Sequence, residues 1–284
     1  MFIASVREGT VETPVFVHEQ KGVLRPRVLD SAFDGDAMEL VKRDVTLGLR
    51  RRAATVSDDQ FEPASRFTFT APYRSPRKIW GIGLNYRDHA GDLDESVPTE
   101  PASFIKADHT IIGTGDDIVI PTQSTRVTAE AELGLIIGRT ARNVSEEDAL
   151  NYVWGVCTIL DQTAEDILRR NPRFLTRAKN FVSFFSFGPL LVPLDHALDV
   201  HGSLDNITVS TVRNDGEEVR TNTVANMTYS PEFLVSFHSR MMPLFPGDIV
   251  STGTPGALVV QDGDVMECRI PGIGNLTNTV RQGE

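Results

Sequence analysis

The chain has 284 residues, enough for one large domain or for a main domain with a smaller one. Its 39 acidic against 28 basic residues give a net charge of −11, which argues against nucleic acid or an anionic membrane surface as a partner. Cys157 and Cys268 lie in separate apolar segments and are expected to be buried free thiols. Because the N-terminus lacks the apolar core of a signal peptide, and no apolar run is long enough to cross a membrane, we expect a cytoplasmic protein.

Residues 1–75 have the pattern of a small separate module. Apolar runs at Phe2–Val6 and Val15–His18 predict short strands, and apolar residues at helical spacing predict a helix over Ala37–Arg52. The following stretch, Pro63–Pro76, is rich in proline and turn residues, which is typical of a linker. The sequence therefore predicts a small N-terminal α+β domain over 1–75 and a larger domain over 76–284.

The larger part of the chain consists mostly of short β-runs separated by turns. Predicted strands are Ile79–Leu84, Ser103–Lys106, Ile118–Ile120, Ala131–Ile137, Val153–Asp161, Leu190–Val192, Ile207–Arg213, Glu218–Val224, Asp248–Thr252 and Val265–Ile270. Asn214–Gly216 predicts a tight hairpin turn. Helices are expected at Glu146–Tyr152, after a capping-box pattern, and at Pro231–Met241. This pattern fits a β-rich α+β fold rather than alternating βαβ units.

Three carboxylates are the most informative feature of the sequence. Glu130 and Glu132 lie two residues apart in the apolar segment Ala129–Gly138, so both project from the same face of a strand. Asp161 ends a second apolar run. A cluster of carboxylate oxygens suits Mg²⁺, Mn²⁺ or Ca²⁺ rather than zinc. The alternative for the glutamate pair alone is an edge strand with a solvated acidic face.

Seven segments, taken in order, resemble the catalytic domain of the fumarylacetoacetate hydrolase superfamily. They are GIGLNYRDHA (81–90), PASFIKA (101–107), EAELGLIIG (130–138), the strand ending at Asp161, RAKNFVSFFSFGP (177–189), PGDIVSTGTPG (246–256) and DGDVMECRIPGIGNLTN (262–278). Each segment is weak alone, and the order of all seven carries the resemblance. It implies a mixed β-roll or sandwich, a homodimer, and a bound Mg²⁺ or Mn²⁺ held by Glu130, Glu132 and Asp161.

The resemblance also assigns candidate catalytic residues. His89 is the expected base, since an imidazole pKa near 6.5 suits proton abstraction near neutral pH. The family's usual partner for this histidine is a glutamate three residues on, where this chain has Asp92. Both fall in a segment, Asn85–Glu100, that we expect to act as a mobile lid. Lys179 is expected to balance the carboxylates and stabilise enolate charge. The alternatives are an ordinary loop histidine and an ordinary surface lysine.

Three further positions are candidate substrate-binding residues. Lys106 matches a family position near the substrate. Thr254 lies in a tight loop, where its hydroxyl could bind a substrate carboxylate or serve only the turn. Glu165 stands where many family members carry arginine. If Glu165 faces the metal, it repels a dicarboxylate; alternatively it faces solvent or pairs with a nearby arginine.

Together these residues predict a Mg²⁺- or Mn²⁺-dependent hydrolase that cleaves a C–C bond of an acylpyruvate-like 2,4-dioxo acid in small-molecule catabolism. The alternative is a lyase or isomerase (a decarboxylase, dehydratase or tautomerase) that acts on a 2-oxo acid at the same metal site. The third hypothesis, from another class, is a metal-binding dimer without turnover.

Overall fold

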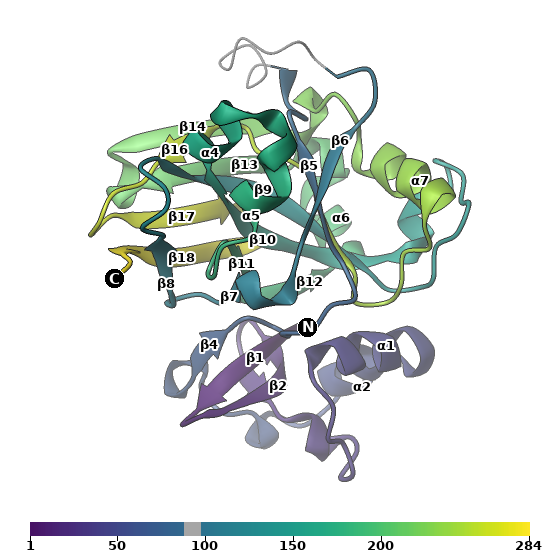
Figure 1. Cartoon of the computed structure of the whole chain (residues 1–284). Coiled ribbons are helices and arrows are strands. Elements are labelled where there is room, and N and C mark those ends of the chain that lie inside the picture. Colours follow the sequence, from purple (N-terminus) through teal and green to yellow (C-terminus); the bar gives the residue numbers. More distant parts are fainter. Residues whose placement is uncertain (88–97) are drawn as a thin grey trace.

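The computed structural model describes residues 1–87 and 98–284. Within them, thirteen strands form one large sheet with the central order β3-β2-β1-β12-β10-β9-β15-β5-β6 (Figure 1). Its strands are β1 Phe2–Glu8, β2 Val11–His18, β3 Gly22–Leu24, β4 Thr68–Thr70, β5 Ile79–Gly83, β6 Ala102–Lys106, β7 Ile111–Ile112, β9 Val127–Ile137, β10 Val153–Ala164, β11 Phe185–Phe187, β12 Leu190–Pro193, β15 Ile249–Ser251 and β16 Ala257–Val259.

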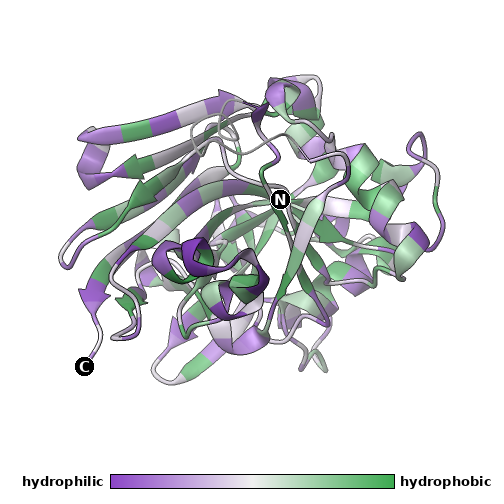
Figure 2. Cartoon of the chain, turned by 45° about the horizontal axis from the view of Figure 1, so that its top comes forward, coloured by the Kyte–Doolittle hydropathy of each residue, from purple (hydrophilic) through white to green (hydrophobic). Residues whose placement is uncertain are grey.

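A second sheet of five strands packs against β9 and β10. Its order is β14-β13-β17-β18-β8, with the bounds β8 Asp117–Ile120, β13 Thr208–Arg213, β14 Glu218–Thr223, β17 Val265–Ile270 and β18 Gly274–Gln282. Leu133, Leu135 and Ile137 of β9 belong to the same buried cluster as Met266 and Leu276 of the smaller sheet. Figure 2 shows hydrophobic stretches along the central strands. Burying one face of β9 in this way leaves its other face for polar side chains.

The helices are short and cover the edges of the sheets. They are α1 Ala37–Leu47, α2 Leu49–Ala54, α4 Glu165–Arg170, α5 Leu175–Lys179, α6 Leu194–His201 and α7 Pro231–Met241. The structure confirms the predicted α7, but the predicted helix over Ala37–Arg52 is divided at Gly48, whose φ of 61° is left-handed. No helix among the described residues is long and apolar enough to cross a membrane.

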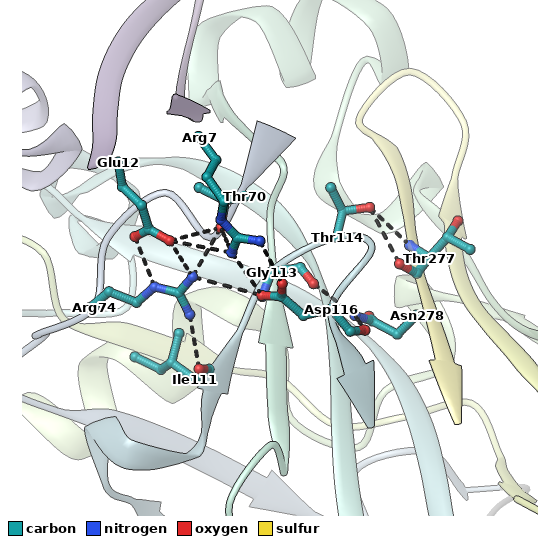
Figure 3. Close-up of polar contacts among 10 residues, drawn as sticks. All are labelled: Arg7, Glu12, Thr70, Arg74, Ile111, Gly113, Thr114, Asp116, Thr277 and Asn278. Carbon is teal, nitrogen blue, oxygen red and sulfur yellow. Dashed lines mark hydrogen bonds and ion pairs between the residues drawn. The ribbon is translucent and has the colours of Figure 1, made fainter. Parts of the chain in front are cut away.

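The N-terminal module is joined to the rest of the chain by main-chain and charged contacts. Its strand β1 pairs with β12, and the stretch predicted as a linker contains β4, which also pairs with β1. Arg7 of β1 lies 3.0 Å from Asp116, while Arg74 pairs with Glu12 at 2.6 Å and donates to the carbonyl oxygen of Ile111 (Figure 3). The module over 1–75 therefore shares a sheet and an ionic network with the catalytic part.

Two further sequence expectations have clear outcomes. The hairpin turn at Asn214–Gly216 is confirmed, since β13 and β14 pair antiparallel across it. The helix expected over Glu146–Tyr152 is wrong. The hydroxyl of Ser145 instead closes a local turn with Asp148, and only a short 3₁₀ helix, Ala149–Tyr152, forms before β10 begins. Both cysteines are buried free thiols, as predicted.

Candidate metal centre and active site

The three candidate metal ligands meet on the ladder between β9 and β10. These strands pair antiparallel, and the register places Asp161 directly opposite Glu130, with Glu132 two residues further along the same face. One carboxylate oxygen from each residue lies within 4.8 Å of the others. Asp161 lies inside β10 rather than at its end, because the strand continues to Ala164. The register, and not proximity in sequence, brings the third carboxylate to the pair.

Two buried lysines face this cluster. Lys179, at the end of α5, places Nζ 2.7 Å from Asp161 Oδ2 and 3.0 Å from Glu130 Oε2. Although burial opposes it, the negative charge of the three carboxylates raises the pKa of Lys179 above its usual value. Lys179 is therefore protonated at neutral pH and acts as a fixed positive charge. This geometry matches its predicted role as a counter-charge to the carboxylates.

The second lysine, Lys106 at the end of β6, also contacts the cluster, and its predicted substrate-binding role stays a prediction. Its side chain is fully buried, with Nζ 2.6 Å from Asp161 Oδ1. It donates to three backbone carbonyls, those of Gln162 at 3.0 Å, Lys179 at 2.7 Å and Phe184 at 2.5 Å. Burial lowers the pKa of Lys106 to about 8, against the opposing effect of Asp161. The ammonium thus links β10, α5 and the residue that precedes β11.

The remaining contacts hold the glutamates in place. Glu132 Oε2 accepts hydrogen bonds from the hydroxyl of Ser251 and from the backbone N–H of Gly253 at 2.9 Å. Thr128 and Thr163 each donate to Glu130 Oε1 at 3.0 Å. Burial, together with the neighbouring Asp161, raises the pKa of Glu132. These four donors were missed from the sequence, although Thr128 could have been found by its spacing of two from Glu130.

The cluster fits a divalent cation. Asp161 Oδ1 is buried and contacts the ammonium of Lys106, which also contacts three carbonyl oxygens and so cannot donate fully to the carboxylate. Three carboxylates face two ammonium groups, so with all five groups ionised the site carries one excess negative charge. Ligand oxygens that bind Mg²⁺ or Ca²⁺ at about 2.0–2.6 Å lie at most roughly 4–5 Å apart, which agrees with the observed spread. Glu130, Glu132 and Asp161 would hold the ion.

Glu165 has the partners that one sequence alternative proposed. At the start of α4, its carboxylate pairs with Arg126 and lies 2.7 Å from Arg169, while its side chain is only 13% exposed. Two guanidinium groups therefore surround one carboxylate. The repulsion that an unpaired Glu165 would exert on a dicarboxylate is offset by this arrangement.

The other predicted residues divide into two groups. Thr254 is buried, and its hydroxyl bonds both the N–H and the carbonyl of Gly256 at 3.2 Å, as the turn alternative expects. His89 and Asp92 lie outside the described residues, as does most of the predicted lid. Two of its described residues, Asn85 and Pro98, are both hydrogen-bonded to Tyr229. The catalytic roles of His89 and Asp92 stay predictions.

A family model matches most of the chain. The fumarylacetoacetate (FAA) hydrolase C-terminal model matches residues 78–281, the part that contains the whole carboxylate cluster. The chain belongs to the fumarylacetoacetate hydrolase family. The predicted β-rich α+β fold is that of this family.

Relatives within the family have several activities. The chain is 31% identical to the mitochondrial oxaloacetate tautomerase Fahd2a of Rattus norvegicus, over 91% of this chain and 84% of that protein. It is 37% identical to the 4-hydroxyphenylacetate degradation bifunctional isomerase/decarboxylase of Salmonella dublin, over 79% of this chain and 51% of that protein. Among solved structures, maleylpyruvate hydrolase from Sphingobium sp. SYK-6 superposes with a TM-score of 0.81 at 25% identity, with both chains fully covered. These relatives are enzymes that act on small organic acids.

Proposed function

We propose that the protein is a Mg²⁺- or Mn²⁺-dependent enzyme that interconverts the keto and enol forms of a small 2-oxo acid such as oxaloacetate. The buried cluster of Glu130, Glu132 and Asp161, with Lys179 against it, is the observation that carries this proposal. The reaction class is supported by the similarity to the rat oxaloacetate tautomerase, which extends through the N-terminal module as well as the catalytic part.

The chemistry needs a positive environment for an oxygen that gains negative charge. A divalent cation bound at the cluster would polarise the keto group of the substrate. Lys179 adds a fixed positive charge at the same place, because its pKa is raised and it stays protonated. In the keto-to-enol direction, one proton leaves the carbon next to the keto group and one is added to the keto oxygen. A protonated Lys179 cannot accept the first proton, so the base must be another group, for which His89 is our candidate.

The surroundings of Glu165 are compatible with a dicarboxylate substrate. Arg126 and Arg169 together carry one more positive charge than Glu165 neutralises. A second carboxylate on the substrate would therefore meet a locally positive group rather than an isolated glutamate. This favours oxaloacetate over a purely monoanionic 2-oxo acid.

Hydrolysis of a C–C bond in an acylpyruvate is the second candidate. It is supported by the likeness to maleylpyruvate hydrolase and by the motif around His89. In this reaction water adds to one carbonyl carbon, the adjacent C–C bond breaks, and the leaving carbon takes up a proton. The two candidates share the metal and Lys179 and differ in whether a base activates water.

One assay separates the candidates. The Mn²⁺-loaded protein is mixed with oxaloacetate and, separately, with an acylpyruvate, and both the enol content and any pyruvate released are followed. We expect keto–enol exchange faster than with Mn²⁺ alone, and no more pyruvate from either substrate than Mn²⁺ alone releases. Glu132→Gln should abolish the effect, while the exposed Glu146→Gln should not. Pyruvate release from the acylpyruvate would favour the hydrolase instead. If Glu132→Gln keeps the wild-type activity, the proposed metal site is contradicted.

A further inference from the structure

A cavity of about 440 Å³ lies between the N-terminal module and the catalytic part. One wall comes from the junction of α1 and α2, and the other from the end of β9, the start of β10 and the start of α6. Charged and aromatic side chains dominate its lining: Asp44, Arg50, Arg51, Arg139, Trp154 and Asp195. Its volume is within the range of pockets that hold small molecules.

The base of this cavity is a fixed network. Asp44 is 8% exposed and accepts a hydrogen bond from the indole N–H of Trp154 at 2.9 Å. Arg50 lies 2.9 Å from Asp44 and 2.8 Å from Asp195, so both modules hold it in place. The guanidinium of Arg50 also lies 6.0 Å from the Trp154 ring. Asp44 and Asp195 therefore neutralise the charge of Arg50, and the floor of the cavity is held in place without a ligand.

Two other arginines that line the same cavity, Arg51 and Arg139, have no carboxylate partner among the described residues. Across the described residues, neither the Arg51 nor the Arg139 guanidinium has an ion pair or a side-chain hydrogen bond, and both residues are exposed. Arg51 comes from α2 of the N-terminal module, and Arg139 directly follows β9 and Gly138 of the catalytic part. With two acids and three arginines, the lining carries one net positive charge in a chain whose total is −11.

We propose that this cavity binds a small multiply charged anion, bearing carboxylate or phosphate groups, between Arg51 and Arg139. Guanidinium groups bind both kinds of anion through paired charge-assisted hydrogen bonds. Because the two arginines belong to different modules, a bound anion would bridge them and stabilise the contact between the modules. The site is separate from the metal centre, since Gly138 directly follows β9 and lies six residues beyond Glu132, roughly 20 Å at 3.3 Å per residue.

Binding is tested on the metal-free full-length protein. Inorganic phosphate and citrate are titrated separately by calorimetry, at an ionic strength held constant with sodium chloride, and thermal unfolding is followed at each concentration. We expect at least one of the two anions to bind and to raise the unfolding temperature. Whether phosphate or citrate binds more tightly distinguishes the two ligand chemistries.

Variants locate the site. Arg51→Ala and Arg139→Ala should each weaken binding by about tenfold, because each removes a charge-assisted contact. Both side chains are exposed and unpaired, so both variants should fold as the wild type does. Arg52→Ala, a neighbouring exposed arginine outside the cavity lining, is the matched control and should bind normally. If neither anion binds at millimolar concentration, or if Arg51→Ala and Arg139→Ala bind as the wild type does, the proposal is overturned.

Discussion

Lys106 offers the sharpest test of how the structure supports its carboxylate cluster. Lys106→Met keeps the length of the side chain but removes an ammonium that contacts Asp161 and three backbone carbonyls. Breaking a buried ion pair by removing one partner costs about 3–5 kcal/mol. Each buried carbonyl left unpaired costs a further ~1–3 kcal/mol. Release of the strongly desolvated lysine offsets part of this total.

We therefore expect Lys106→Met to lower the free energy of unfolding by about 3–5 kcal/mol. The corresponding fall in unfolding temperature is roughly 10 °C for a chain of this size. Urea unfolding of the metal-free protein, at one fixed protein concentration, measures the change. Lys21→Met is the matched control. It removes an exposed ion pair with Asp58, which is worth at most about 1 kcal/mol.

The result also separates two roles for Lys106. A substrate-binding lysine would leave stability unchanged and raise KM when replaced. A loss of less than about 1 kcal/mol, equal to that of the Lys21 control, would refute the structural role argued above.

Three further outcomes follow from the structure. Glu165→Gln leaves Arg126 and Arg169 without the carboxylate that they share, so KM for dicarboxylates should fall severalfold relative to KM for monocarboxylates. An unchanged ratio of the two KM values would mean that Arg126 and Arg169 do not face the substrate. The hydrogen bond from Arg74 lowers the pKa of Glu12, so the ionised carboxylate stabilises the fold above pH 4.5 and loses that contribution as the pH falls through its lowered pKa. Glu12→Gln should therefore make the free energy of unfolding less dependent on pH on the acid side. An unchanged dependence would count against the network in Figure 3. Light scattering should give twice the chain mass of 31.3 kDa if the protein is a homodimer, and a single-chain mass across micromolar concentrations would exclude this.

The three candidate metal ligands could be predicted from the sequence. The alternation of charged and apolar residues along β9 placed Glu130 and Glu132 on one face, and the structure agrees. Asp161 was grouped with them from its place at the end of an apolar run and from the resemblance. The strand register that sets it opposite Glu130 is a long-range property, which one strand's pattern does not contain. Lys106 shows the limit most clearly. Its fully buried position depends on carbonyls from three other segments, none of which is visible in the motif that contains it.

The fold shows the same division between local and long-range information. The apolar run of β10 and the capped helix α7 have strong local patterns and were predicted with nearly the observed bounds. The strand β18 was missed because its glycine and asparagine residues are unfavourable in strands, and it is formed by pairing with β17 and β8. The pairing of β1 with β12, which makes the N-terminal module part of the large sheet, depends on residues about 190 positions apart.

The central claim is that Glu130, Glu132 and Asp161 bind one divalent cation. Titration of the metal-free protein with Mn²⁺ by calorimetry tests it without relying on any substrate. We predict one site per chain, with affinity lowered by at least about 10–100-fold in both Glu132→Gln and Asp161→Asn, and unchanged in Glu146→Gln. Binding of Mn²⁺ by Glu132→Gln and Asp161→Asn as tightly as by the wild type would contradict the account.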